Sequence, residues 1–197
     1  MVYTTKSHKN IPDLVRGEKI IIGLIGRPGV GKDTVAKIIA SVSRKKTDTF
    51  SFSKILIEEY CAHLGIEPTH PNLQYVGDAI RPSWLHDRAR RSIEESDAEI
   101  IIIPSVRRIQ DFEFIQSFKT HKLIGVVTDE RKAFERMKLR KEKPGEEHLT
   151  WESYQALRIA PIDAEVGTLL EKAEVTIHND GDLEDLTKQI TQIFSDV

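Results

Sequence analysis

A glycine-rich segment that ends in a lysine carries the clearest chemical signal in the chain. Residues 26–34 read Gly-Arg-Pro-Gly-Val-Gly-Lys-Asp-Thr, which matches G-x-x-x-x-G-K with Asp33 where serine or threonine is usual. The glycines allow backbone N–H groups to turn inward around an anion, in conformations that a Cβ would obstruct. Lys32 adds a full positive charge for the β- and γ-phosphates of a nucleotide. The segment predicts a phosphate-binding loop, called the P-loop (residues 26–32) below.

The same segment predicts a binding site for ATP and Mg²⁺. Asp33 is expected to hold Mg²⁺ directly or through a water, and Thr34 supplies the next hydroxyl, for the α-phosphate. A chance glycine turn before a helix is the alternative interpretation. The residues expected to bind these cofactors here are Gly26, Arg27, Gly29, Val30, Gly31, Lys32, Asp33 and Thr34.

The elements that position the loop are recognisable on either side of it. Residues 18–25 form a β-branched run that is typical of a buried strand. Apolar residues then recur at helical spacing between residues 32 and 43. The positive end of that helix dipole points at the loop, which favours anion binding there. The flanking strand and helix argue against a chance turn.

Strands and helices continue to alternate along the rest of the chain. Further strands are expected at residues 47–52, 98–103, 122–127 and 174–177, and helices at 54–64, 73–80, 84–95, 109–118, 130–141, 150–157, 164–173 and 183–194. This alternation predicts an α/β fold of three layers, with a parallel central sheet and helices on both faces. Residues 1–17 are polar and aperiodic, so we expect an N-terminal tail ahead of a single domain at 18–197.

The composition narrows the possible partners. The 197 residues carry 29 Lys+Arg against 31 Asp+Glu, a net charge of -2, so no basic excess points to a nucleic-acid polymer or an anionic membrane. Cys61 is the single cysteine and cannot form an internal disulfide. The N-terminus lacks the apolar segment of a signal peptide, and no apolar run is long enough to span a bilayer. We therefore expect a cytoplasmic protein.

Arginines are the further catalytic candidates, because phosphoryl transfer depends on positioning and charge neutralisation. Arg136 and Arg140 lie four residues apart on one helix face, ahead of a Pro-Gly loop. A solvated charged face is the alternative for both. Arg107 or Arg108 follows the third expected strand, at the edge where ligands collect in open α/β sheets. Here the alternative is a surface salt bridge with Asp111. The predicted catalytic set is Lys32, Arg107, Arg136 and Arg140.

Several segments together resemble a group of small-molecule kinases. The G-K-D-T form of the P-loop is similar to that of deoxynucleoside monophosphate kinases and animal-type phosphomevalonate kinases. Residues 51–54, 73–78 with Arg81, 107–111 and 179–181 are similar to further motifs of that group, in the same order. The resemblance covers most of residues 18–195. It implies that residues 51–54 begin the acceptor-side helix and that Asn179 and Gly181 pass near adenine.

The residues expected to bind the phosphate acceptor follow partly from the family resemblance and partly from the residue types themselves. The resemblance implies a role for Ser53, and Arg107 fits the acceptor side as well as the catalytic set. Arg81 is the preferred member of an arginine cluster that suits an acceptor phosphate. Asp78 is expected to orient the acceptor or a metal-bound water. The predicted substrate-binding residues are Ser53, Asp78, Arg81 and Arg107.

One position departs from the families that the chain resembles. They usually carry an acidic residue just before the strand-end arginine, and here that position is Ser105. The missing carboxylate bears on the contact with the metal or the acceptor. Asp33 or Asp78 is expected to compensate; the alternative is a reduced or different activity.

The first interpretation is an ATP-dependent small-molecule kinase that transfers the γ-phosphoryl group to a (deoxy)nucleoside monophosphate. It has an acceptor-binding insertion at about 53–96 and a lid at about 136–160, and it is a monomer or homodimer whose partner is a small-molecule phosphate acceptor. The second keeps the fold and takes dephospho-coenzyme A or phosphomevalonate. The pattern of Arg107, Arg108 and Asp111 slightly favours phosphomevalonate. The third, from another class, is a P-loop ATPase or regulatory protein that binds nucleotide without kinase activity.

Overall fold

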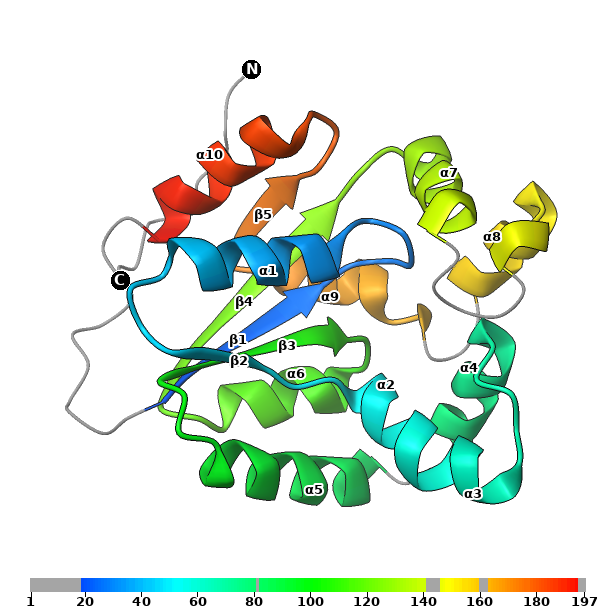
Figure 1. Cartoon of the computed structure of the whole chain (residues 1–197), viewed down its shortest axis with the longest axis horizontal. Helices are drawn as coiled ribbons and strands as arrows, with labels where there is room; N and C mark the ends of the chain where they lie inside the picture. Colours follow the sequence, from blue (N-terminus) through cyan, green and yellow to red (C-terminus); the bar gives the residue numbers. More distant parts are fainter. Residues whose placement is uncertain (1–18, 81, 141–145, 160–162, 195–197) are drawn as a thin grey trace.

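The chain is built on a five-stranded sheet whose neighbouring strands are all parallel (Figure 1). The computed structural model describes residues 19–80, 82–140, 146–159 and 163–194. The strands are β1 (Ile20–Ile25), β2 (Thr47–Thr49), β3 (Ile100–Val106), β4 (Thr120–Val127) and β5 (Val175–His178), in the order β2-β3-β1-β4-β5. The α/β fold with a parallel central sheet is thereby confirmed.

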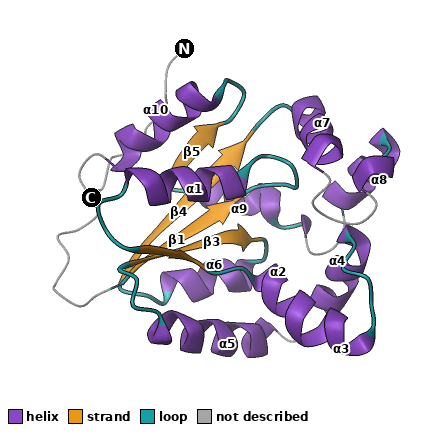
Figure 2. Ribbon diagram, in the orientation of Figure 1, coloured by secondary structure: helices purple, strands orange, loops and turns teal. Residues whose placement is uncertain are grey.

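Helices cover both faces of the sheet, as Figure 2 shows. The helices are α1 (Lys32–Val42), α2 (Phe52–Ile55), α3 (Ala62–Leu64), α4 (His70–Ala79), α5 (Pro82–Glu95), α6 (Ile109–Gln116), α7 (Glu130–Arg140), α8 (Trp151–Arg158), α9 (Val166–Lys172) and α10 (Leu183–Phe194). A π-helix, Leu56–Cys61, joins α2 to α3, and a short 3₁₀ turn, Glu146–His148, precedes α8.

Strand β1 shows how the sequence produces these layers. Its side chains alternate between the two faces of the sheet, as every strand requires. Ile20, Ile22 and Leu24 pack with residues of α1 and α10, whereas Ile21 and Ile25 pack with residues of α5, α6 and α9. All six residues of β1 are buried, which explains the continuous apolar run in the sequence.

The third strand runs further than the expected end at residue 103. It continues to Val106, which pairs with Ile25 of β1. The register shifts just before this pair, so β3 contains a β-bulge that includes Pro104. A proline is tolerated at a bulge because no ladder hydrogen bond depends on its missing N–H. Ser105 therefore lies within a central strand.

Two other expectations are corrected on the acceptor side. The strand expected at 47–52 ends at Thr49, since Ser51 is already the N-cap residue of α2. The single helix expected at 54–64 is α2, the π-helix and α3 in succession. Its apolar side chains still face the core, among them Ile55, Leu56 and Cys61. A π-turn widens the helix without changing its apolar pattern, so periodicity alone does not reveal it.

A small separate apolar cluster joins α7 to α8. Phe134 and Met137 of α7 pack with Tyr154 and Leu157 of α8. This cluster lies beside the P-loop, because the Ala133 carbonyl of α7 stands against Gly29. Within the described ranges, no helix is long and apolar enough to cross a membrane.

Candidate phosphate-binding site

The P-loop turns tightly between β1 and α1, and two of its glycines are required by geometry. Gly29 has φ 81° and Gly31 has φ 93°, a region that favours glycine. A Cβ on Gly29 would lie 2.4 Å from the Ala133 carbonyl oxygen. A Cβ on Gly31 would lie 2.4 Å from Nδ2 of Asn179. The loop therefore follows a path that side chains at these positions would block.

Helix α1 begins directly after the loop and presents its first turn. Its N-cap residue, Gly31, has no side chain that could cap the helix. The first N–H groups of α1 are therefore left to bind an anion, with the helix dipole favouring negative charge. Asp33 and Thr34 are exposed on this turn, while Val30 is buried beneath the loop. This is the arrangement that the sequence predicts for phosphate binding.

The Lys32 side chain folds back over the loop. Its Nζ donates hydrogen bonds to the carbonyl oxygens of Gly26, at 2.7 Å, and Arg27, at 2.9 Å. Burial lowers the pKa of Lys32 to about 7, and the nearby Arg107 guanidinium also lowers it, while the Asp163 carboxylate opposes the change. An anionic ligand beside Lys32 would restore its positive charge. The lysine is thus poised to respond to phosphate.

A cavity of about 280 Å³ opens beside the P-loop. It brings together seven of the predicted site residues: Gly29, Gly31, Lys32, Asp33, Ser53, Arg107 and Arg140. Ser105, at the position of the missing carboxylate, also faces this cavity. The complete described lining is Pro28, Gly29, Gly31, Lys32, Asp33, Ser51, Ser53, Lys54, Ile57, Glu58, Pro104, Ser105, Arg107 and Arg140.

Arg107 projects into the cavity from the end of β3 and is held by a buried carboxylate. Its Nη1 donates to Oδ2 of Asp163 at 3.1 Å, and the Asp163 side chain is 0% exposed. Asp163 precedes α9 and belongs to no recognisable motif, so the sequence gives no signal for this functional residue. Its charge also acts on Lys32. Asp163 therefore acts on two of the four predicted catalytic cations, Arg107 and Lys32.

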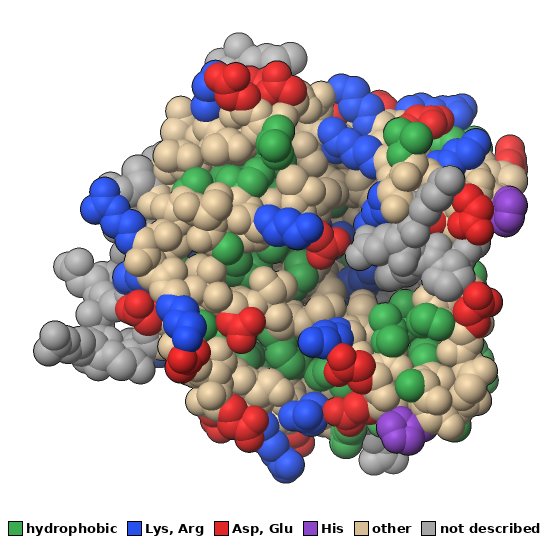
Figure 3. All heavy atoms as spheres, in the orientation of Figure 1, with side chains coloured by type: hydrophobic (Ala, Val, Ile, Leu, Met, Phe, Trp, Pro, Cys, Tyr) green, Lys and Arg blue, Asp and Glu red, His purple; other side chains and the backbone are tan. Residues whose placement is uncertain are grey.

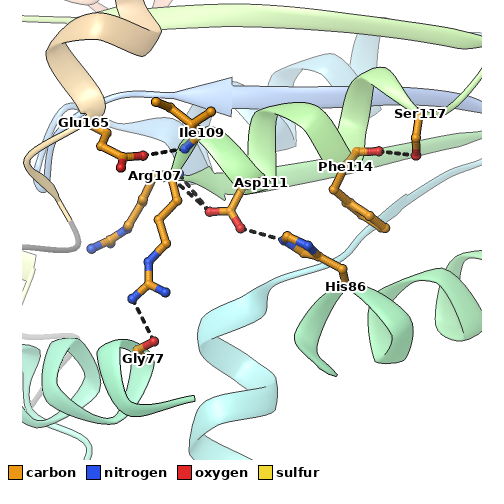
Figure 4. A network of polar contacts seen from close by, with 9 residues as sticks. Gly77, His86, Arg107, Ile109, Asp111, Phe114, Ser117 and Glu165 are labelled. Carbon is orange, nitrogen blue, oxygen red and sulfur yellow. Dashed lines mark hydrogen bonds and ion pairs between the residues drawn. The ribbon is translucent and has the colours of Figure 1, made fainter. Parts of the chain in front are cut away.

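The turn that carries Arg107 is fixed by two further carboxylates (Figure 4). Oδ2 of Asp111 accepts hydrogen bonds from the backbone N–H groups of Arg107 and Arg108, each at 3.2 Å. Its Oδ1 lies 2.9 Å from Nε2 of His86 on α5. Glu165 accepts from the backbone N–H of Ile109 at 2.5 Å. Asp111 thus holds the backbone of the turn and ties it to α5.

The neighbouring Arg108 points elsewhere. Its Nη2 donates to the backbone carbonyl of Gly77 on α4, at 2.7 Å. The two adjacent arginines therefore have different surroundings: Arg107 lines the cavity, and Arg108 joins the strand-end turn to α4. Asp78 also lies on α4, but its side chain is outside the described set, and Arg81 lies outside the described residues.

The two arginines of α7 also differ. Arg140 lines the cavity and forms an ion pair of 2.7 Å with Glu146, which is buried rather than solvated. Arg136 is not among the described lining residues; its Nη1 donates to the Asn179 carbonyl oxygen at 2.9 Å. Lys and Arg side chains gather around α7 on the face seen in Figure 3. This positive surface adjoins the P-loop side of the molecule.

The loop after β5 supports the P-loop from behind. Nδ2 of Asn179 donates to the Val30 carbonyl oxygen at 2.8 Å, and its own backbone N–H donates to Val127. Gly181 follows two residues later, where a Cβ would meet the Asp185 side chain. Arg27 turns toward α8, donating to the Arg158 carbonyl oxygen at 2.7 Å. Asn179 thus stabilises the P-loop through a direct hydrogen bond to its backbone.

The residues present fit a phosphate-bound magnesium ion better than a metal held by protein alone. The described residues contain no group of three or more His, Cys, Asp or Glu side chains placed to hold an ion. Asp33 lines the cavity next to the open first turn of α1. Magnesium commonly takes one or two carboxylates, with waters and substrate phosphates as its other ligands. Asp33 and Glu58 are the carboxylates in the described lining, and the metal role of Asp33 stays a prediction from the sequence.

Comparison with known proteins places the fold. No protein-family model matches the sequence. The chain is 25% identical over 171 residues to a protein named UPF0200 protein from Aeropyrum pernix. The aligned region covers 85% of this chain and 88% of that protein.

Solved structures of shikimate kinases share the architecture. The structure from Bacteroides thetaiotaomicron is 14% identical and superposes with a TM-score of 0.61, covering 89% of this chain and 98% of that one. The shikimate kinase of Aquifex aeolicus is 12% identical, with a TM-score of 0.54, and covers 89% of this chain and 96% of that one. The chain therefore shares its fold with these shikimate kinases.

Proposed function

We propose that this protein is an ATP-dependent small-molecule kinase, with a (deoxy)nucleoside monophosphate as the preferred acceptor. The observation that carries the proposal is the meeting of Lys32, Arg107 and the open first turn of α1 around one cavity. Phosphoryl transfer needs little covalent chemistry, and its catalysis comes from positioning and neutralisation of charge. A site lined by these cations and loop N–H groups supplies both.

ATP fits the donor half of the cavity. The P-loop N–H groups and Lys32 would hold the β- and γ-phosphates, and Mg²⁺, bound through Asp33, would neutralise their remaining charge. Arg140 enters from α7, so it would reach the same phosphates. The shared fold with shikimate kinases supports a donor of this type.

The acceptor half lies between the start of α2 and the end of β3. Ser53, Lys54 and Glu58 form one wall, and Ser105 and Arg107 form the other. These groups suit a small polar acceptor with an anionic group. The resemblance of the sequence motifs favours a nucleoside monophosphate, with dephospho-coenzyme A and phosphomevalonate as alternatives. Shikimate is a further candidate acceptor, because the structural neighbours are named shikimate kinases.

The test is an ADP-release assay with Mg-ATP and a panel of acceptors. The panel holds the deoxy- and ribonucleoside monophosphates, dephospho-coenzyme A, phosphomevalonate and shikimate. Lys32→Ala is the control for the P-loop. ADP release that one nucleoside monophosphate stimulates, and that Lys32→Ala abolishes, supports the proposal. Stimulation by another panel member would replace the acceptor and keep the kinase.

An alternative from another class is a nucleotide-binding ATPase or regulatory protein. Ser105 gives the end of β3 a hydroxyl in place of a carboxylate, which argues against an ordinary ATPase as much as against an ordinary kinase and favours a protein that binds nucleotide without turnover. ADP release that ignores every acceptor would favour the ATPase. Binding of ATP without ADP release would favour a nucleotide-dependent regulator.

A further inference from the structure

Two buried hydrogen-bond donors at the end of β3 lack partners among the described residues. Oγ of Ser105 and Nε of Arg107 bond to no group in the part of the chain that the structure describes. Ser105 is 8% exposed, and the Arg107 side chain is 14% exposed. Buried polar groups in native proteins are nearly always paired, so an unpaired one calls for an explanation. Two such groups, two residues apart, point to a shared ligand.

Both residues line the same cavity, and the β-bulge explains why. Ile103 of β3 pairs with Gly23, and Val106 pairs with Ile25, so β3 has one more residue than β1 over this stretch. Consecutive residues of a regular strand face opposite sides, but here Pro104 and Ser105 both line the cavity. Bulges re-aim side chains in this way and are frequent next to active sites.

The charges around the two donors select an anion. Arg107 and Lys32 lie close enough to influence one another, and Arg140 lines the same cavity. Asp163 occupies Nη1 of Arg107 and leaves Nε to another acceptor. Asp33 and Glu58 are the carboxylates in the described lining, and both could share a cation with the ligand. A phosphate group offers enough acceptor oxygens for both donors at once.

We propose that Ser105 and Arg107 form an oxyanion subsite that binds a phosphate group through Ser105 Oγ–H and Arg107 Nε–H. The inference rests on the proposed function insofar as the P-loop places a nucleotide beside it. It gives Ser105 a role opposite to that of a carboxylate, which would repel the same oxygens. The phosphate is either the γ-phosphate of ATP or the phosphate of the acceptor.

The test compares Ser105→Ala with wild type by calorimetric titration of Mg-ATP, Mg-ADP and inorganic phosphate, the last with Mg-ADP already bound. Removal of one hydrogen bond to a charged group should weaken binding about tenfold. A loss confined to Mg-ATP assigns the γ-phosphate as the ligand. A loss confined to inorganic phosphate assigns the acceptor's phosphate. Both outcomes support the subsite.

Stability separates this role from a structural one. Because the buried hydroxyl has no partner among the described residues, Ser105→Ala should leave the melting temperature of the ligand-free protein unchanged or raise it. Ser41→Ala is the matched control: Ser41 lies on α1, where its Oγ donates to the Ile38 carbonyl oxygen, away from the cavity lining. It should leave all three affinities unchanged. Ser105→Asp should abolish binding of the assigned phosphate through repulsion.

Several results would overturn the subsite. One is a lower melting temperature for Ser105→Ala with all three affinities intact. A second is an equal loss for Mg-ATP and Mg-ADP with inorganic phosphate unaffected, since the contact would then involve no terminal or acceptor phosphate. A third is tighter phosphate binding in Ser105→Asp. If Ser105-dependent binding holds but no panel member accepts phosphate from ATP, the proposed function fails and the subsite stands.

Discussion

Arg107 and Asp163 form a buried ion pair, with 3.1 Å between Nη1 and Oδ2, although 56 residues separate them in the sequence. Arg107 directly follows the last residue of β3 and lines the cavity. Asp163 lies between α8 and α9. The carboxylate has no exposed surface. The carboxylate therefore fixes the position of the Arg107 guanidinium through Nη1, and Arg107 still lines the cavity where a ligand would bind.

Asp163→Asn should both destabilise the protein and impair phosphotransfer. Loss of one partner leaves Arg107 as a buried charge without compensation, which costs about 3–5 kcal/mol of the free energy of unfolding. The guanidinium would also lose its fixed position. Chemical denaturation gives the first effect, and the ADP-release assay gives the second. Unchanged stability together with unchanged activity would contradict the assigned role.

A double variant separates the two effects. Arg107→Leu with Asp163→Leu removes the whole pair and leaves no buried charge, so stability should recover relative to Asp163→Asn. Activity should not recover, because the cation in the cavity is gone. If activity also returned, Arg107 would have no part in the chemistry.

The sequence predicts the structure well where the backbone or the burial of a short segment restricts which residues can occupy it. The P-loop is recognisable because its backbone requires glycine, as the φ of 93° at Gly31 shows. Strand β1 is recognisable because every residue is buried and apolar. The closing helix at Leu183–Phe194 has the bounds that its apolar spacing predicts.

The missing parts depend on contacts between distant segments. The sequence does not distinguish Asp163 from the other acidic residues, because it does not show whether a carboxylate is buried or exposed to solvent. The extension of β3 to Val106 depends on its pairing with β1, against the local preference of Pro104. Glu146 stands in a charged segment of the sequence, yet it is buried against Arg140. Tertiary context decides each of these.

Gly29→Ala should abolish nucleotide binding. The new Cβ would lie 2.4 Å from the Ala133 carbonyl oxygen of α7, at a φ of 81° that already disfavours alanine. Overpacking against backbone and left-handed strain together should cost about 3 kcal/mol of the free energy of unfolding. Titration with Mg-ATP and chemical denaturation measure the two effects.

Gly65→Ala is the matched control for that variant. Gly65 also has positive φ, 64°, but a Cβ added there would meet no described atom within 4 Å. Strain alone should cost about 1 kcal/mol, with nucleotide binding unchanged. Equal losses of affinity in the two variants would show that backbone strain, and not the crowded path of the P-loop, is responsible.

Asn179→Ala should weaken ATP binding by loosening the P-loop. It removes the 2.8 Å hydrogen bond from Nδ2 to the Val30 carbonyl oxygen and leaves that buried oxygen unpaired. The loss is expected to be about tenfold in affinity, the equivalent of one hydrogen bond. Asn72→Ala is the control, since Nδ2 of Asn72 donates to the Glu67 carbonyl oxygen at the same distance on an exposed surface. Similar losses in both would refute a specific role for Asn179.

Nucleotide binding should take up a proton above neutral pH. Burial lowers the pKa of Lys32 to about 7 in the free protein, so at pH 8 the side chain is largely neutral. Bound phosphates favour the charged form and raise this pKa, so binding at pH 8 must add the missing proton. At pH 6 the lysine is already charged and contributes little uptake.

The uptake is measurable by calorimetric titration of Mg-ADP in buffers of different ionisation enthalpy. The number of protons bound per nucleotide should approach one at pH 8 for the wild-type protein. Lys32→Arg keeps a charge at both values of pH, because the guanidinium does not lose its proton in this range. The variant should therefore show no uptake at pH 8. Uptake by Lys32→Arg equal to that of the wild type would mean that another group, and not Lys32, binds the proton.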